Sequence, residues 1–310
     1  MSSNQLTNIV MMIRPSHFGY NKETALDNVY QKSSKTISSY EIVKKALFEF
    51  NKFVNVLENA GINVIKFEDD LKLITPDSVF PNNWISTHDN GIIWLYPMFA
   101  PNRRIERRQD ILNYLETNFQ IFKIEDKMLK HESMGKFLEG TGSMVLDREN
   151  NIAYACVSNR TNDHLFYQWC ENMNFKGISF SANDSGKPIY HTNVLMSICK
   201  TMVFICLDAI YDNEQKNELL LSFADTHKEV VNISKSQMNH FLGNVLELQN
   251  DNNESYLVMS TTAFNCLNDS QKERINKKMK ILHSPLDTIE YFGGGSARCM
   301  IAEIFLKPNN

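Results

Sequence analysis

The chain has 310 residues and a formal net charge of −4 at neutral pH. Apolar residues make up 43% of it and charged residues 22%, which excludes a collagen-like, a disordered or a disulfide-dense chain. The charge leaves no basic footprint for nucleic acid or for an anionic membrane.

The first residues carry neither a basic region nor a long apolar run, so we expect no signal peptide. No apolar stretch reaches the about 20 residues of a membrane helix, and Lys200 interrupts the longest candidate, 188–207. We therefore expect a cytoplasmic protein with reduced thiols. Its cysteines form no CxxC or CxxxxH cluster, which argues against a zinc site.

Short strands and helices alternate along the whole sequence. Strands rich in Ile, Val, Phe and Tyr are predicted at 8–13, 62–67, 91–96, 119–124, 143–147, 152–157, 176–181, 194–199, 202–207, 229–233, 245–249, 256–260, 280–283 and 299–306. Helices are predicted at 40–60, 104–118, 163–174, 212–223 and 261–278. Without a Gly/Ser- or Pro-rich linker, the pattern favours one α/β domain over residues 1–310, with mixed sheets.

Three segments suggest a nucleophilic site. Cys299 follows three consecutive glycines in YFGGGSARCM (291–300), and such a run needs a backbone reason, for example a tight turn beside a cleft. A thiolate needs a nearby proton acceptor, and His191 is a candidate. Glu139, before a Gly–Thr–Gly turn, could orient that histidine. Taken singly, each residue is more often structural.

Three further segments offer polar groups to a substrate. Asn82 and Asn83 in VFPNNW form either a plain turn or a pair of amides at a pocket. Arg103 and Arg104 in APNRRIERR, and Arg160 in SNRTN, stand beside Pro or Asn at predicted loops. Guanidinium groups at such positions can bind a carboxylate through two hydrogen bonds.

In their order, the segments VFPNNW, APNRRIE, FLEGTGS, SNRTN, YHTN, GNVLEL and GGGSARCM resemble the guanidine-modifying superfamily. That superfamily has the pentein fold and includes arginine deiminase, dimethylarginine dimethylaminohydrolase and the amidinotransferases. The resemblance spans about residues 8 to 306. MIRPSHF (12–18), PNNWIST (81–87) and STTAFNCL (260–267) resemble the citrulline hydrolase, or citrulline ureidase, branch. The resemblance implies a five-bladed, pseudo-symmetric α/β propeller of ββαβ units around a central substrate channel.

The resemblance also implies roles for the site residues. Cys299 corresponds to the nucleophile, His191 to the general acid/base, and Glu139 to the carboxylate of the EGGD-type motif. Ser143 stands where that motif has an aspartate, which puts the role of that aspartate in doubt.

The substrate-binding positions depart from the deiminases. Arg160, and either Arg103 or Arg104, correspond to arginines that grip the amino-acid carboxylate. Two aspartates that hold the guanidinium in arginine deiminases correspond to Asn83 and Asn193. Neutral amides cannot pair a buried guanidinium, whereas an amide matches the donors and acceptors of a urea. The pair of asparagines therefore favours citrulline over arginine.

We predict hydrolysis of L-citrulline to L-ornithine, CO2 and ammonia through a covalent cysteine thioester, with no metal or organic cofactor. One alternative is an arginine or methylarginine deiminase of the same superfamily. Others are transfer of the amidino or carbamoyl group to an amine, and a catalytically dead protein that senses citrulline or arginine. The expected partner is a small amino acid, with no nucleic acid and no membrane. The sequence leaves open whether the chain forms a homo-oligomer.

Overall fold

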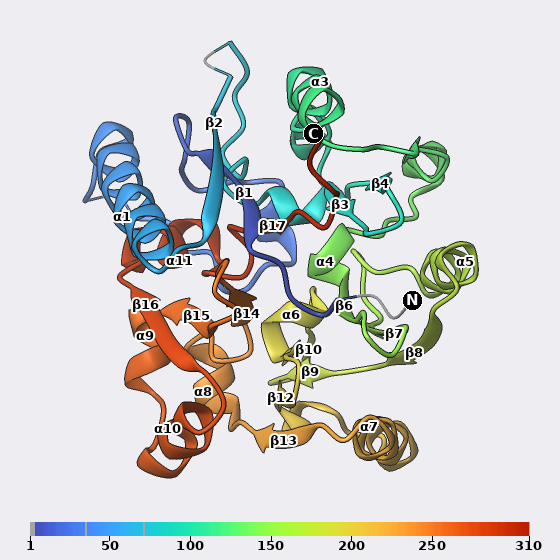
Figure 1. The fold of residues 1–310 in the computed structure, drawn as a ribbon. Helices are drawn as coiled ribbons and strands as arrows, with labels where there is room; N and C mark the ends of the chain where they lie inside the picture. Colours follow the sequence, from blue (N-terminus) through green and yellow to red (C-terminus); the bar gives the residue numbers. More distant parts are fainter. Residues whose placement is uncertain (1–3, 35, 71, 310) are drawn as a thin grey trace.

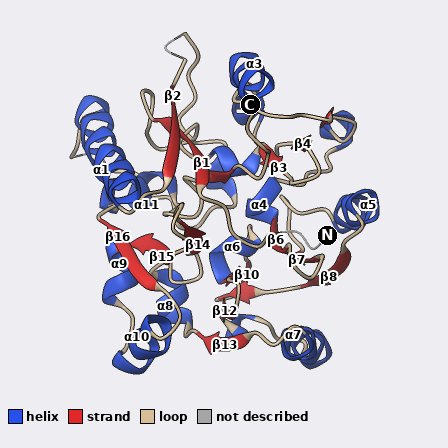
Figure 2. Ribbon diagram, viewed as in Figure 1, coloured by secondary structure: helices blue, strands red, loops and turns tan. Residues whose placement is uncertain are grey.

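Five small sheets surround a common centre in the computed structural model, which describes residues 4–34, 36–70 and 72–309 (Figures 1 and 2). In strand order they are β17 (Ala302–Glu303), β1 (Ile9–Arg14), β2 (Asn63–Glu68); β3 (Ile85–Thr87), β4 (Ile92–Leu95), β5 (Lys123–Glu125); β6 (Met144–Asp147), β7 (Ile152–Cys156), β8 (Lys176–Phe180); β11 (Met196–Ile198), β12 (Met202–Ile205), β13 (Glu229–Asn232); and β14 (Leu246–Gln249), β15 (Ser255–Ser260), β16 (Lys280–Ser284). In each sheet the middle strand is antiparallel to the first and parallel to the third.

Helices connect the parallel strands and lie on the outside of the ring (Figure 1). They are α1 (Ser39–Asn59), α3 (Gln109–Asn118), α5 (Asp163–Met173), α7 (Asn213–Asp225) and the pair α9 (Thr261–Asn265) and α10 (Asp269–Asn276). Shorter helices are η1 (Thr24–Leu26), η2 (Pro81–Asn83), α2 (Pro101–Arg104), η3 (Leu129–Met134), α4 (Gly140–Ser143), α6 (Thr192–Leu195), η4 (Leu207–Ala209), α8 (Lys235–Asn239) and α11 (Asp287–Gly293). A two-stranded hairpin, β9 (Asn183–Asp184) and β10 (Lys187–Pro188), completes the described elements.

Helix α1 shows how local sequence sets an element. Ser38 Oγ accepts from the Glu41 N–H at 3.2 Å, and the Ser38 N–H donates to Glu41 Oε2 at 3.2 Å, which satisfies free donors at the helix start. Gly61, with φ of +82°, follows the helix in a conformation that glycine adopts at little cost. The helix buries one apolar stripe in the core: Ile42, Ala46, Phe50, Phe53, Val54 and Leu57.

The end of the chain closes the ring onto its beginning. Strand β17 pairs with β1, where Val10 lies opposite Glu303 and Met11 opposite Ala302. Thr7 Oγ1 donates to the Ile304 carbonyl at 2.6 Å beside this pair. Closure holds the turn before β17 at the centre of the molecule.

The segments that precede the first strand of each sheet lie on the inside of the ring. Helices α4 and α6 stand near the centre in Figure 1, and α4 packs against both α6 and η2. Each carries polar residues that are buried nevertheless. Buried polar groups need partners, so these inner segments are where a site can be built.

The mixed α/β sheets and most predicted strands are confirmed, while several boundaries are wrong. The strand expected at 194–199 begins only at Met196, because α6 occupies the residues before it. The strand expected at 299–306 shortens to β17, since turns around Cys299 precede it. Only Lys123–Glu125 of 119–124 forms a strand, and β3 was not predicted.

Two predicted helices are interrupted. Of the helix expected at 104–118, Arg104 ends α2 and only Gln109–Asn118 forms α3. The helix expected at 261–278 divides into α9 and α10, and the side chain of Asn268 caps α10 by accepting the Gln271 N–H at 2.8 Å. The glycine run at 293–295, expected to let the chain turn tightly, ends helix α11, where Gly294 takes a φ of +63°.

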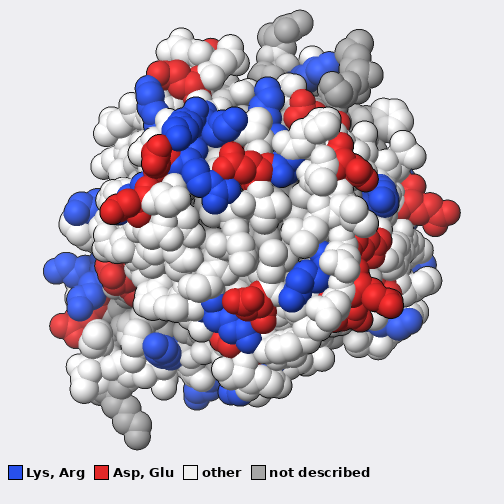
Figure 3. All heavy atoms as spheres, turned by 90° about the horizontal axis from the view of Figure 1, so that it is seen from below, with Lys and Arg blue, Asp and Glu red and all other residues white. Residues whose placement is uncertain are grey.

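Figure 3 shows the charged side chains on one face of the molecule. On the face shown in Figure 3, Lys and Arg stand interspersed with Asp and Glu. No described helix is long and apolar enough to cross a membrane.

Two phenylalanines on α1 provide a test of the core. Phe53 is fully buried, so Phe53→Ala should lower the free energy of unfolding by about 3 kcal/mol or more, through lost burial and a cavity. Phe48, on the same helix, is 62% exposed, and Phe48→Ala should cost about 0.5 kcal/mol. Urea unfolding measures both, and equal losses would contradict the packing of α1.

Candidate active site

Cys299 lies in the turn before β17, only 4% exposed. Two asparagine amides face its sulfur: Asn244 Nδ2 lies 3.1 Å and Asn193 Nδ2 3.5 Å from Sγ. The Cys299 N–H also donates to Ser296 O at 3.0 Å and to Asn244 Oδ1 at 3.3 Å. Burial raises the pKa of the thiol, and these donors oppose that rise only in part. The resting group is therefore a thiol beside two donors that can stabilise negative charge.

His191 and Glu139 form a buried pair close to Asn193. His191 lies just before α6 and Glu139 just before α4, and His191 Nε2 lies 2.8 Å from Glu139 Oε2. Burial lowers the pKa of His191, and the hydrogen bond to Glu139 opposes that change. Histidine is therefore neutral at pH 7 and donates Nε2–H to the carboxylate, which leaves Nδ1 to accept a proton.

Glu139 remains ionised in spite of its burial. Burial favours the neutral acid, but Arg160 and His191 outweigh it and lower the pKa of Glu139 to about 2. Its Oε1 accepts the Phe99 N–H at 2.8 Å, and Oε2 lies 3.6 Å from Arg160 Nη1. A fixed carboxylate with this environment can stabilise an imidazolium during a reaction.

Two glycines explain the Gly–Thr–Gly turn. A Cβ on Gly142 would lie 2.4 Å from Asn83 Nδ2 and 2.8 Å from His191 Nδ1, so both side chains rest directly on this glycine. Gly140 has a φ of +48°, and a Cβ there would meet the Asn82 carbonyl at 2.4 Å. The turn thus needs glycine for close approach and for its backbone conformation.

Arg103 fixes the amide of Asn83. Its Nη1 donates to Asn83 Oδ1 at 2.6 Å, while Nε and Nη2 bind the Glu106 carboxylate at 3.0 and 2.8 Å. Nη2 also donates to the Phe80 carbonyl at 3.0 Å. With its oxygen engaged, Asn83 presents Nδ2 toward the side where the ring of His191 lies.

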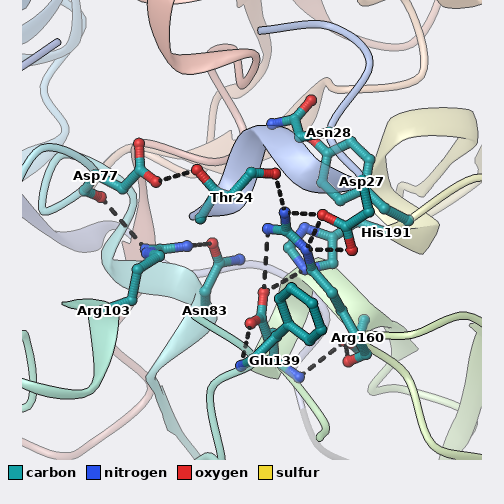
Figure 4. Close-up of polar contacts among 12 residues, drawn as sticks. Thr24, Asp27, Asn28, Asp77, Asn83, Arg103, Glu139, Arg160 and His191 are labelled. Atoms are coloured by element: carbon teal, nitrogen blue, oxygen red, sulfur yellow. Dashed lines mark hydrogen bonds and ion pairs between the residues drawn. The ribbon is translucent and has the colours of Figure 1, made fainter. Parts of the chain in front are cut away.

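Arg160 lies across the site, with its guanidinium against the Tyr190 ring at 4.8 Å. Nε donates to Asp27 Oδ1 at 3.0 Å, and Nη2 donates to the same carboxylate and, at 2.8 Å, to the Thr24 carbonyl (Figure 4). The remaining Nη1 faces Glu139. The two arginines therefore stand on opposite sides of Thr24 in Figure 4.

Arg104 lies outside this cluster. Its Nε donates to Met98 O at 3.0 Å and lies 3.4 Å from Glu132 Oε2, so the guanidinium faces the periphery. Of the two arginines that the sequence left open, Arg103 is the one beside Asn83. Ser143 Oγ accepts the Glu139 N–H at 2.8 Å and donates to the Arg160 carbonyl at 2.7 Å. It ties the two charged segments together.

Sequence reasoning missed Asp77 and did not foresee the contact that Asn244 makes with the nucleophile. Asp77 is buried, its Oδ2 accepts from Asn21 Nδ2 at 2.7 Å and Thr24 Oγ1 at 2.9 Å, and its Oδ1 has no partner among the described residues. Burial raises the pKa of Asp77, against the effect of nearby Arg103. Asn244, which the sequence offers as a turn residue at the rim of the channel, contacts the sulfur of Cys299. Asp77 has no local signal, since its importance comes from burial and partners.

No group of three or more His, Cys, Asp or Glu side chains within residues 4–34, 36–70 and 72–309 is arranged to hold a metal ion. The chemistry that this arrangement offers is nucleophilic attack by a thiol, proton transfer by a carboxylate-held histidine, and charge stabilisation by amides.

The family model described as "N,N dimethylarginine dimethylhydrolase, eukaryotic" matches residues 14–306. No curated protein matches the chain. Among solved structures, the chain is similar to ArgZ, an arginine dihydrolase from the ornithine–ammonia cycle in cyanobacteria, with 16% identity and a TM-score of 0.74. That similarity covers 97% of this chain and 41% of ArgZ, so this chain spans less than half of the relative.

Two further structures share the fold. A cysteine-to-serine mutant of the N-terminal domain of ArgZ, bound to substrate, has a TM-score of 0.71 at 16% identity, over 96% of this chain and 99% of that domain. A dimethylarginine dimethylaminohydrolase adduct has a TM-score of 0.66 at 14% identity, over 96% of this chain and 100% of that one. The five mixed three-stranded sheets are thus the pentein fold.

The family model spans nearly the whole chain and includes every segment of the site. This chain therefore belongs to the eukaryotic N,N dimethylarginine dimethylhydrolase family, within the guanidine-modifying, or pentein, superfamily.

Proposed function

We propose that this cysteine-dependent C–N hydrolase cleaves the ureido group of citrulline to give ornithine, CO2 and ammonia. The observation that supports this substrate is the set of amides around the reactive centre. Asn193 and Asn244 face the sulfur of Cys299, and the Asn83 amide lies against Gly142, next to the ring of His191. None of them carries a charge.

A buried guanidinium needs anionic partners, because an unpaired charge costs several kcal/mol in the interior. The carboxylate nearest the histidine, Glu139, is already shared between His191 and Arg160. A neutral urea instead needs both donors and acceptors. Asn193 Oδ1 is buried without a partner among the described residues and can accept from the ureido NH2. Asn83 Nδ2 can donate to the ureido oxygen.

The first chemical step forms a bond from Cys299 Sγ to the ureido carbon. His191 takes the thiol proton at Nδ1, and the electron pair of the carbonyl moves onto its oxygen. The amide N–H groups of Asn193 and Asn244 stabilise that developing charge. His191 then gives the proton to the departing nitrogen, either that of ornithine or ammonia, and a thioester remains.

The second step releases the thioester. His191, neutral again, takes a proton from a water that attacks the same carbon, and then protonates the sulfur of Cys299 as the C–S bond breaks. When ornithine leaves first, the released acid is carbamate, which decomposes to CO2 and ammonia. Glu139 stabilises the imidazolium of His191 in both steps.

Two charged groups suit the other end of an amino acid. Arg160 provides a guanidinium for the α-carboxylate, and the free Oδ1 of Asp77 provides an acceptor for the α-ammonium group. Together they favour a zwitterionic amino acid over a simple amine.

Arginine or a methylated arginine is the second candidate substrate, and the comparisons favour it. The family description names dimethylarginine, and ArgZ is an arginine dihydrolase. The same Cys299, His191 and Glu139 would serve, with the guanidino carbon as the point of attack.

A product assay separates the two candidates. Citrulline, arginine and dimethylarginine are supplied separately, and ornithine, citrulline and ammonia are quantified. We expect ornithine from citrulline, and no product with Cys299→Ala, which lacks the nucleophile. Conversion of arginine to citrulline, with no turnover of citrulline itself, would overturn the argument from the asparagines.

The pH profile tests the role assigned to His191 and Glu139. Burial holds the pKa of His191 below 6.5, and neutral His191 is the form that accepts the thiol proton, so kcat/KM should fall as the pH drops through that lower value. Glu139→Gln removes a charge that raises the pKa of His191. The acidic limb should therefore move to lower pH, while kcat falls about a hundredfold.

Glu132→Gln is the matched control, because Glu132 pairs with Arg107 away from the sulfur. It should leave the acidic limb in place. If the acidic limb of the Glu139→Gln variant moves to higher pH or does not move, the result would contradict the proposed pairing of Glu139 with His191.

A further inference from the structure

The guanidinium assigned to the substrate carboxylate is already occupied by a carboxylate of the chain itself. Arg160 binds Asp27 through Nε and Nη2, and its Nη2 also reaches the Thr24 carbonyl at 2.8 Å. Asp27 follows η1 in the segment between β1 and α1 (Figure 4). Arg160 is 2% exposed, and Asp27 15%. A second carboxylate can use this two-pronged donor only if Asp27 leaves it.

The same segment also binds one oxygen of the carboxylate assigned to the substrate ammonium, and leaves the other oxygen, Oδ1, without a partner among the described residues. Asn21 Nδ2 and Thr24 Oγ1 both donate to Asp77 Oδ2, at 2.7 and 2.9 Å. Thr24 lies between Asp77 and Arg160, with its hydroxyl toward the first and its carbonyl toward the second (Figure 4). Residues 21–27 thus offer a carboxylate to the arginine and hydrogen-bond donors to the aspartate. An α-amino acid offers the same complement.

The segment has room to move at Asp27. A surface hollow of about 330 Å³ borders this residue and is lined by Leu26, Ser158 and Tyr190 among others. Leu26 is 79% exposed, so the tip of the segment packs little apolar surface. Beyond Asp27 the chain is fixed again, because Asn28 Nδ2 donates to Gly293 O at 3.3 Å and Lys32 N to Tyr291 O at 2.8 Å.

We propose that Asp27 is an internal competitor for the α-carboxylate of the substrate and thereby sets the affinity of the site for amino acids. This inference rests on the proposed function in one respect, the assignment of Arg160 as the carboxylate receptor. A ligand with an α-carboxylate exchanges one carboxylate for another at Arg160, so part of its binding free energy is spent on displacing Asp27. A ligand that lacks the carboxylate leaves Asp27 in place.

Binding to the inactive Cys299→Ala protein tests this exchange. Calorimetry compares citrulline with N-carbamoylputrescine, and arginine with agmatine, in which only the carboxylate is missing. With Asp27→Asn added, the Kd of citrulline or arginine should fall about tenfold, because charge-assisted hydrogen bonds no longer compete. The Kd of the decarboxylated partner should stay the same.

Two further variants control for damage to the segment. Asp27→Glu keeps a carboxylate and should bind amino acids more weakly than Asp27→Asn does. Leu26→Ala changes an exposed neighbour and should bind like the parent protein. Thermal unfolding shows whether each variant is folded. If Asp27→Asn does not fold, Asp27→Glu is compared with the parent protein instead.

Three outcomes would contradict the proposal that Asp27 competes with the substrate carboxylate for Arg160. In the first, Asp27→Asn weakens the binding of amino acids or leaves it unchanged. In the second, it strengthens both ligand classes equally. In the third, no carboxylate-bearing ligand binds any variant, which removes Arg160 as the receptor. Failure of the proposed function is a separate result. In that case the wild-type protein forms no ornithine from citrulline, but Asp27→Asn still lowers the Kd of arginine and leaves that of agmatine unchanged.

Discussion

A buried carboxylate, Glu139, is the constraint on which the rest of the site depends. Ionised carboxylates are costly in the interior, so Glu139 must be compensated, and His191 and Arg160 provide the compensation. The hydrogen bond to His191 sets which ring nitrogen is free for chemistry. Arg160, placed by the same charge, reaches Asp27 on the far side. One charge therefore connects proton transfer with the region where a substrate head group would bind.

The ring of sheets explains how residues far apart in the chain meet. Each sheet is entered by a segment that lies inside the ring, and these segments carry Asn83, Glu139, His191, Asn244 and Cys299. Pairing of β17 with β1 closes the ring, so the nucleophile joins the cluster although it is the last of these residues in the chain. Gly142 and Gly243 permit the close approach, since a Cβ on Gly243 would lie 2.3 Å from the Val194 carbonyl.

Much of the fold could be predicted from the sequence because its signals are local. The apolar stripe and cap of α1, and the short β-rich runs, specify their elements directly. Cys299, His191 and Glu139 are each ambiguous in the sequence, and they were singled out by the order of the segments that carry them and by the family resemblance of that order. The break before α10 was missed although its capping box, Asn268 with Gln271, is local. The short β17 was missed because the turn around Cys299 depends on tertiary contacts.

The missed site residues follow the same rule. Asp77 and Asp27 look like ordinary loop aspartates in the sequence, and only the fold buries one and seats the other on Arg160. Likewise, the sequence offered Arg103 and Arg104 as equals. Only the structure places one against Asn83 and turns the other toward Glu132.

The central claim is that Cys299 attacks a ureido carbon. Rapid acid quenching of the protein during turnover of citrulline, followed by mass spectrometry of the peptide that contains Cys299, tests it most directly. We expect a transient adduct on Cys299 derived from citrulline, with the mass of a carbamoyl group when ornithine leaves first. An amidino-type adduct that forms from arginine, with none from citrulline, would contradict it.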